Sequence, residues 1–71
     1  MNHSIQGSYR KQVFSAVIKQ DPLTKSWVWK GYVDFDVGHH SMLSSRSFAT
    51  AIQAEEHMRQ AAYLCIDNRL G

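Results

Sequence analysis

The chain has 71 residues, which suffices for one small domain. Hydrophobic residues make up 44% of it and charged residues 20%, a composition typical of a folded protein and unlike that of disordered segments. The single cysteine, Cys65, excludes an intramolecular disulfide and a zinc site built from several cysteines. A net charge of +2 does not by itself indicate nucleic-acid binding.

The sequence contains no targeting or membrane-spanning pattern. No apolar run reaches the roughly 18 residues of a membrane span, and the N-terminal stretch lacks the apolar core of a signal peptide. We therefore expect a cytoplasmic protein without a membrane partner.

Residues 1–8 are polar and contain a glycine, which favours a flexible N-terminal tail before a single domain over residues 9–71. A strand is expected from Tyr9 to Lys19, where β-branched and aromatic residues are frequent. Asp21 and Pro22 then form a turn signal.

The segment from Trp27 to Val37 alternates between apolar and polar residues with a period of two. Such alternation is typical of a strand with one buried and one exposed face. The apolar set, which we expect to be buried, consists of Trp27, Trp29, Val33, Phe35 and Val37. The opposite face carries Val28, Lys30, Tyr32, Asp34 and Asp36.

Gly38 to Ser41 reads as the next turn, and Met42 to Phe48 as a weaker third strand. A helix follows, because Thr50 and Gln53 have the spacing of a capping box. Its expected buried face is made of small residues and one methionine: Ala51, Ala54, Met58, Ala61, Ala62 and Cys65. The predicted fold class is α+β, a three-stranded antiparallel meander with one C-terminal α-helix packed on one face (β-β-β-α).

The candidates for catalysis and metal binding are weak. His39 and His40 are adjacent, so their side chains point apart in an extended chain, whereas a metal site needs three or four converging ligands. Cys65 lies on the expected inner helix face without a neighbouring base. We expect no metal, no cofactor and no enzymatic activity.

Nucleic-acid binding is a further hypothesis, because basic residues and one aromatic residue could lie on or near the sheet. The candidate residues are Arg10, Lys11, Lys25, Lys30, Tyr32 and Arg46. Two observations disfavour it: Asp34 and Asp36 share the face of Lys30 and would repel phosphates, and Arg10 and Lys11 cannot both face one way in a strand.

Two stretches carry a resemblance to known families. The turn "DPLTK" and the helix start "SFATAIQAEEHMRQA", in this order of elements, resemble the three-strand-plus-helix domains of plant AP2 factors and of the N-terminal region of phage integrases. The likeness covers roughly residues 9–63 and implies a sheet face that enters a DNA groove. The families carry several arginines and aromatics on that face, where this chain has Lys30 and Tyr32 beside two aspartates.

The C-terminal third, "FATAIQAEEHMRQAAYLCIDNRLG", is similar to short uncharacterised proteobacterial proteins that end in the pattern F-x-T-x-x-x-A-E…A-A…I-D. The matching residues are Phe48, Thr50, Ala54, Glu55, Ala61, Ala62, Ile66 and Asp67. This resemblance implies a strand followed by a helix, and it implies no activity.

The leading hypothesis is a small non-enzymatic binding or interaction module that contacts a protein partner or associates with itself. One helix leaves one sheet face bare, and some helix residues fall outside the inner stripe. The expected interaction surface is Val28, Tyr32, Ile52, Tyr63, Ile66 and Leu70. The alternative is a weak nucleic-acid-binding domain that uses the outer sheet face, and the third and weakest is a metal-dependent or enzymatic role for the His39-His40 turn.

Overall fold

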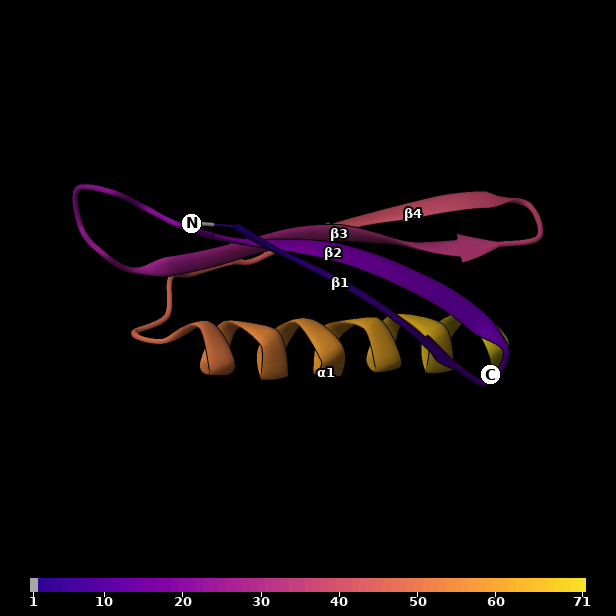
Figure 1. Ribbon diagram of the computed structural model, residues 1–71. Helices are drawn as coiled ribbons and strands as arrows, with labels where there is room; N and C mark the ends of the chain where they lie inside the picture. Colours follow the sequence, from indigo (N-terminus) through magenta and orange to yellow (C-terminus); the bar gives the residue numbers. More distant parts are fainter. Residues whose placement is uncertain (1) are drawn as a thin grey trace.

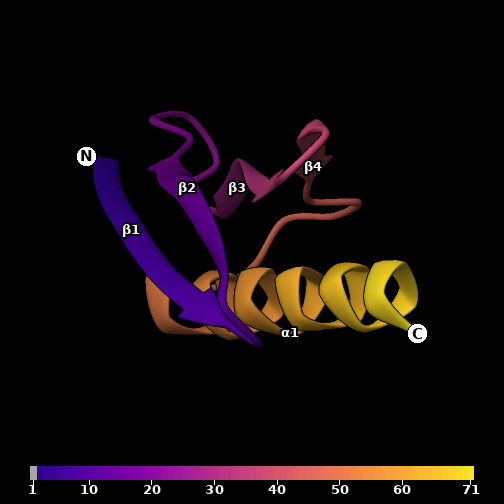
Figure 2. The same ribbon diagram turned by 90° about the vertical axis from the view of Figure 1, so that its right-hand side faces the viewer.

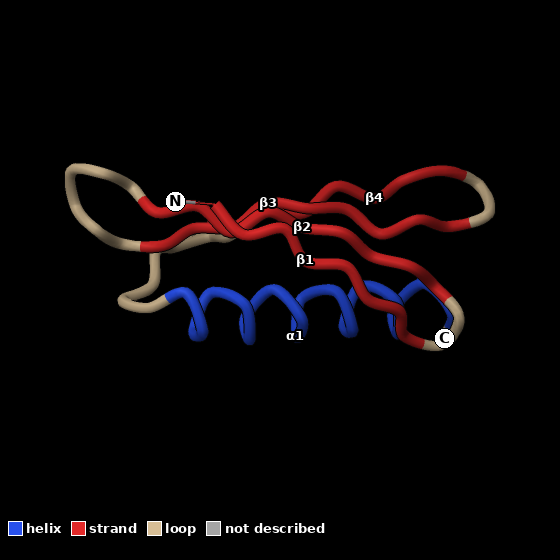
Figure 3. Tube along the Cα trace, in the orientation of Figure 1, coloured by secondary structure: helices blue, strands red, loops and turns tan. Residues whose placement is uncertain are grey.

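A computed structural model describes residues 2–71, which form a four-stranded antiparallel sheet and one C-terminal helix. The strands are β1 (Asn2–Tyr9), β2 (Gln12–Gln20), β3 (Trp27–Phe35) and β4 (Gly38–Leu43), and they lie side by side in chain order. The helix α1 (Ala51–Leu70) packs on one face of this sheet (Figures 1 and 3). Seen from the side, the domain is one layer of strands above one helix (Figure 2). The α+β meander and the C-terminal helix are thus confirmed, but the sheet has four strands and not three.

The additional strand is β1, so the expectation of a flexible tail over residues 1–8 is wrong for residues 2–8; Met1 lies outside the described residues. β1 pairs with β2 through a two-residue turn, with Tyr9 opposite Gln12. Arg10 and Lys11 form that turn at φ 51° and 67°, the left-handed pair of a type I′ hairpin. This turn usually contains Asn-Gly, so Arg-Lys concealed the hairpin in the sequence.

The turn between the last two strands also differs from expectation. The chain reverses at Asp36 and Val37, with Phe35 opposite Gly38, so the expected turn over 38–41 is part of β4. Val37 is therefore an exposed turn residue and not a core residue. Of the expected third strand, Met42 and Leu43 belong to β4, while Phe48 returns separately to form a bridge with Trp27.

The alternation of β3 predicted its buried face correctly. Trp29 and Val33 are buried on the helix side, whereas Trp27 and Phe35 are half-buried at the strand ends. Phe14, Ala16 and Ile18 of β2 lie beside them. The two tryptophans therefore belong to the core layer and its margin, where their large apolar surfaces contribute most to stability.

The helix begins where the sequence predicts. Thr50 has extended backbone geometry, and its hydroxyl oxygen accepts a hydrogen bond of 3.1 Å from the Gln53 N–H. Gly71 caps the other end at φ 95°. The buried stripe is Ala54, Met58, Ala62 and Ile66, spaced four residues apart. Ala51, Ala61 and Cys65, which were expected in this stripe, are only half-buried.

The small residues have a packing role at the centre of the sheet. Gly31 lies directly opposite Ala16, and a Cβ atom added to Gly31 would meet the Ser15 carbonyl oxygen and lie 2.7 Å from the Ala16 Cβ. A strand glycine commonly marks such a close approach. Because the obstructing atoms belong mainly to the backbone, they cannot move aside as a flexible side chain would.

We expect Gly31→Ala to lower the free energy of unfolding by about 1–3 kcal/mol, since overpacking forces the strands apart. Urea unfolding followed by tryptophan fluorescence measures this change. Ser4→Ala, at an exposed position of β1, is the control and should change stability by less than about 0.5 kcal/mol. A Gly31→Ala protein as stable as the wild type would contradict the close packing described above.

Candidate functional site

The sheet face opposite α1 is not covered by any helix or strand of residues 2–71 (Figure 2). We call it the open face. The register brings together side chains from all four strands on it: Ser4, Gln6, Ser8, Val13, Ser15, Val17, Lys19, Val28, Lys30, Tyr32, Asp34, His39, Ser41 and Leu43.

The open face is hollowed at its centre. A depression of about 600 Å³ lies over the middle of the sheet, and Val17, Lys30, Tyr32 and Leu43 contribute to its rim. The Tyr32 side chain is 39% exposed and that of Leu43 is 74% exposed. Exposed apolar side chains that cluster around a depression with a polar rim are typical of a contact surface.

Charge is unevenly distributed along the open face. Lys19 and Lys30 lie toward one end, and neither forms an ion pair within residues 2–71. Asp34 lies toward the other end and pairs with His39 of β4. The end with the lysines would therefore favour an acidic group of a ligand.

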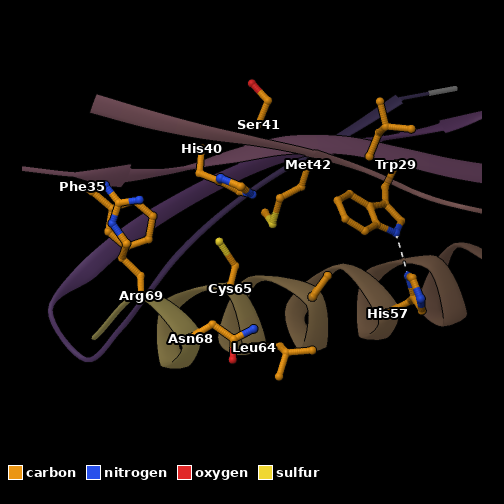
Figure 4. A pocket seen from close by; sticks show the side chains of 12 residues that line it. Trp29, Phe35, His40, Ser41, Met42, His57, Leu64, Cys65, Asn68 and Arg69 are labelled. Carbon is orange, nitrogen blue, oxygen red and sulfur yellow. Dashed lines mark hydrogen bonds between the residues drawn. The ribbon is translucent and has the colours of Figure 1, made fainter. Parts of the chain in front are cut away.

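A second hollow lies on the helix side, between β4 and the C-terminal half of α1 (Figure 4). We call this space of about 530 Å³ the helix-side cleft. Met42 and His40 line it from the strand, and Leu64 and Cys65 line it from the helix. At one end the indole N–H of Trp29 donates a hydrogen bond of 3.1 Å to Nδ1 of His57.

The helix-side cleft offers little for nucleophilic catalysis. Burial raises the pKa of the Cys65 thiol above its ordinary value, which disfavours the reactive thiolate. Within residues 2–71 the thiol has no hydrogen bond to His40 or His57, although both line the same cleft. The arrangement therefore lacks the nucleophile–base contact that this chemistry requires.

The residues predicted for nucleic-acid binding do not gather on one surface. Lys30 and Tyr32 lie together on the open face. Arg10 belongs to the β1–β2 turn and pairs with Asp67 of α1 at 3.0 Å, beside the turn residue Lys11. Lys25 lies in the β2–β3 loop, and the Arg46 guanidinium lies 5.0 Å from the centre of the Phe48 ring.

The residues predicted for an interaction surface are also divided. Val28 and Tyr32 lie on the open face, whereas Ile52 and Leu70 are exposed on the helix. Tyr63 is half-buried, with its ring 4.5 Å from that of Tyr9 and 6.0 Å from that of Phe14.

The prediction of Ile66 as a surface residue is wrong, because its side chain is fully buried under the sheet. In sequence it fell outside the expected alanine-rich stripe. The stripe is rotated toward Ile66 because the helix packs chiefly on β2 and β3.

Part of the open face was not anticipated from the sequence. Ser41 and Leu43 both belong to β4. The sequence instead predicted Ser41 in a turn and Leu43 in a strand that runs from Met42 to Phe48. Val17 also lines the depression. The sequence did not predict this position, because it did not show which side of β2 faces the helix. Only the pairing of β2 with β3 settles that orientation.

Within residues 2–71, no three side chains of histidine, cysteine, aspartate or glutamate come close enough together to hold a metal ion. In the same range no helix is both long and apolar enough to cross a membrane.

Comparisons with protein-family models, with curated proteins and with solved structures found no match to this chain.

The contact between the β1–β2 turn and α1 predicts a pH effect. The Tyr9 hydroxyl donates a hydrogen bond of 3.2 Å to the Asp67 carboxylate, and this bond, followed by burial, raises the pKa of Tyr9 above its ordinary value of about 10. A raised pKa in the folded state means that the stability from Tyr9 is present below about pH 10 and is lost as pH rises through the raised pKa.

We expect Asp67→Ala to move the pKa of Tyr9 back toward its ordinary value, measured by NMR from the ring carbon that bears the hydroxyl. Glu56→Ala removes one exposed acid elsewhere on the helix and should leave the Tyr9 titration unchanged. An identical Tyr9 titration in the Asp67→Ala protein would show that the hydrogen bond does not form in solution.

Proposed function

We propose that this domain is a non-enzymatic binding module that recognises a segment of another protein on the open face of its sheet. The observation that carries the proposal is the position of Tyr32 and Leu43, whose exposed apolar surfaces meet at a depression of the uncovered face. A fold stabilised only by its helix-side core does not need apolar groups there.

Tyrosine suits such a contact. Its ring offers a large apolar surface with few rotatable bonds, and its hydroxyl retains a hydrogen-bonding group. Tyr32 packs against His39 of β4, and the two rings meet edge to face with their centres 5.0 Å apart. A partially fixed side chain loses less conformational entropy when it binds.

The floor of the depression is equally suited to binding. It is formed by hydrogen-bonded strands around the close approach of Ala16 and Gly31, which supports a preformed surface. Lys30 on its rim favours a partner that combines apolar residues with an acidic residue.

A nucleic acid is the second candidate ligand, because Lys30 and Tyr32 present a cation beside an aromatic ring. Non-specific binding draws its energy from several phosphate contacts made at once. Lys19 and Lys30 are the only lysines or arginines among the residues of the open face, and Asp34 carries the opposite charge on it. Two lysines beside one aspartate are too few for several phosphate contacts, which favours a protein segment over a nucleic acid as the ligand.

We expect the double variant Val28→Ser/Tyr32→Ser to lose binding of peptides that are selected on the wild-type domain from a random peptide library displayed on phage. The loss should be at least about tenfold, the effect of truncating a central contact residue. The matched control, Ile52→Ser/Leu70→Ser, removes two exposed apolar side chains from the helix and should bind the same peptides normally.

Equal binding by both variants, or the absence of any selected peptide, would contradict the proposal. Fluorescence anisotropy with single-stranded and duplex DNA tests the second candidate. Tight binding that requires Lys30 and weakens steeply with salt would identify a nucleic acid, and not a protein segment, as the ligand of the open face.

A further inference from the structure

The outer edge of β4 carries unpaired backbone groups. The Ser44 N–H donates to the Trp29 carbonyl at 2.9 Å, which continues the register of β3 and β4. Because hydrogen-bonded pairs alternate along an antiparallel ladder, the even-numbered residues of β4 bond to β3. His39, Ser41 and Leu43 therefore direct their N–H and C=O groups outward, where no strand of residues 2–71 lies.

This edge lacks the usual protection against strand pairing. The six residues of β4, GHHSML, include no lysine, arginine, aspartate, glutamate or proline. Natural sheets commonly use those residues to prevent edge-to-edge contact. β1, at the other edge, is similarly uncharged, so sequence alone does not distinguish the two edges.

The space on the helix side distinguishes them, because the depression of the open face is lined by residues of both β1 and β4, whereas the helix-side cleft is lined from the sheet edge by β4. An added strand directs alternate side chains to opposite sides of a sheet, and both sides of β4 are hollowed. On one side lies the helix-side cleft (Figure 4), where Leu64 is 62% exposed, and on the other lies the depression of the open face. Beside β1, in contrast, Tyr9 already stacks on Tyr63 of the helix.

A second copy of β4 has side chains that fit these spaces. Antiparallel pairing of Ser41 with Ser41 places His39 opposite Leu43, so the outward groups of both strands form about six hydrogen bonds. The same register sets His40 beside the Met42 of the second copy, next to both helix-side clefts.

From these observations we propose that the domain forms a two-fold homodimer through β4, with Ser41 at the centre of one continuous eight-stranded sheet. The contact is isologous, so it is complete with two copies. Pairing of β4 with the β1 of another copy would instead add copies one after another and form an open filament. The inference is independent of the ligand of the open face, since it uses the backbone of the edge and the helix-side cleft.

The test compares two proline variants by sedimentation equilibrium. The wild-type protein should reach twice its mass of 8.1 kDa as its concentration rises. Ser41→Pro removes an outward N–H from each strand of the pair, and it should weaken dimerisation at least about tenfold.

Ser4→Pro is the matched control. Tyr9 and Gln12 flank the two-residue turn as a bonded pair, so the even-numbered residues of β1 direct their N–H groups outward. This variant changes serine to proline at an outward position of the other edge and should dimerise normally. The Val28→Ser/Tyr32→Ser protein should also dimerise normally, which separates this inference from the function proposed above.

Hydrogen exchange of the wild-type protein should show protection of the His39, Ser41 and Leu43 amides that increases with protein concentration. A monomeric mass at millimolar concentration, or a dimer that is sensitive to Ser4→Pro and not to Ser41→Pro, would overturn the proposal.

Discussion

The structure depends on the contact between one helix and one face of a four-stranded sheet. Ala54, Met58, Ala62 and Ile66 face Phe14, Ile18, Trp29 and Val33, and together they form most of the buried core. Small helix residues and the Gly31–Ala16 pair permit a close approach, while the large side chains fill the remaining space. In a chain of 71 residues without a disulfide, this single interface supplies most of the hydrophobic stabilisation.

The same contact determines what is left uncovered. One helix packs chiefly on β2 and β3, so β4 lies at the margin of the layer and the opposite face of the sheet has no cover. The depression around Tyr32 and the helix-side cleft beside Leu64 both follow from this arrangement. Ser41, Met42 and Leu43 line both hollows, which makes β4 the element where the two surfaces meet.

The two proposals use different chemical groups of this neighbourhood. Peptide recognition on the open face uses the side chains of Tyr32 and Lys30, whereas dimerisation uses the backbone of His39, Ser41 and Leu43. Two-fold pairing through β4 would join two open faces into one surface. A module with a modest binding area per copy would then present two linked sites to one partner, which raises its effective affinity.

The sequence by itself determined the elements that carry strong local signals. The alternation of residues 27–35 predicted the inner side of β3, and Thr50 predicted the start of the helix, because side-chain period and capping act over a few neighbouring residues. The exposed positions of Val28 and Tyr32 follow from the same alternation.

Only the tertiary structure decided that residues 2–8 form a strand, that Gly38 to Ser41 belong to β4, and that Ile66 is buried. β1 and β4 are polar edge strands with little periodicity, and they exist because they pair with β2 and β3. The rotation of the helix about its own axis depends on which strands lie above it. This rotation determines that Ile66 is in the core and not on the surface.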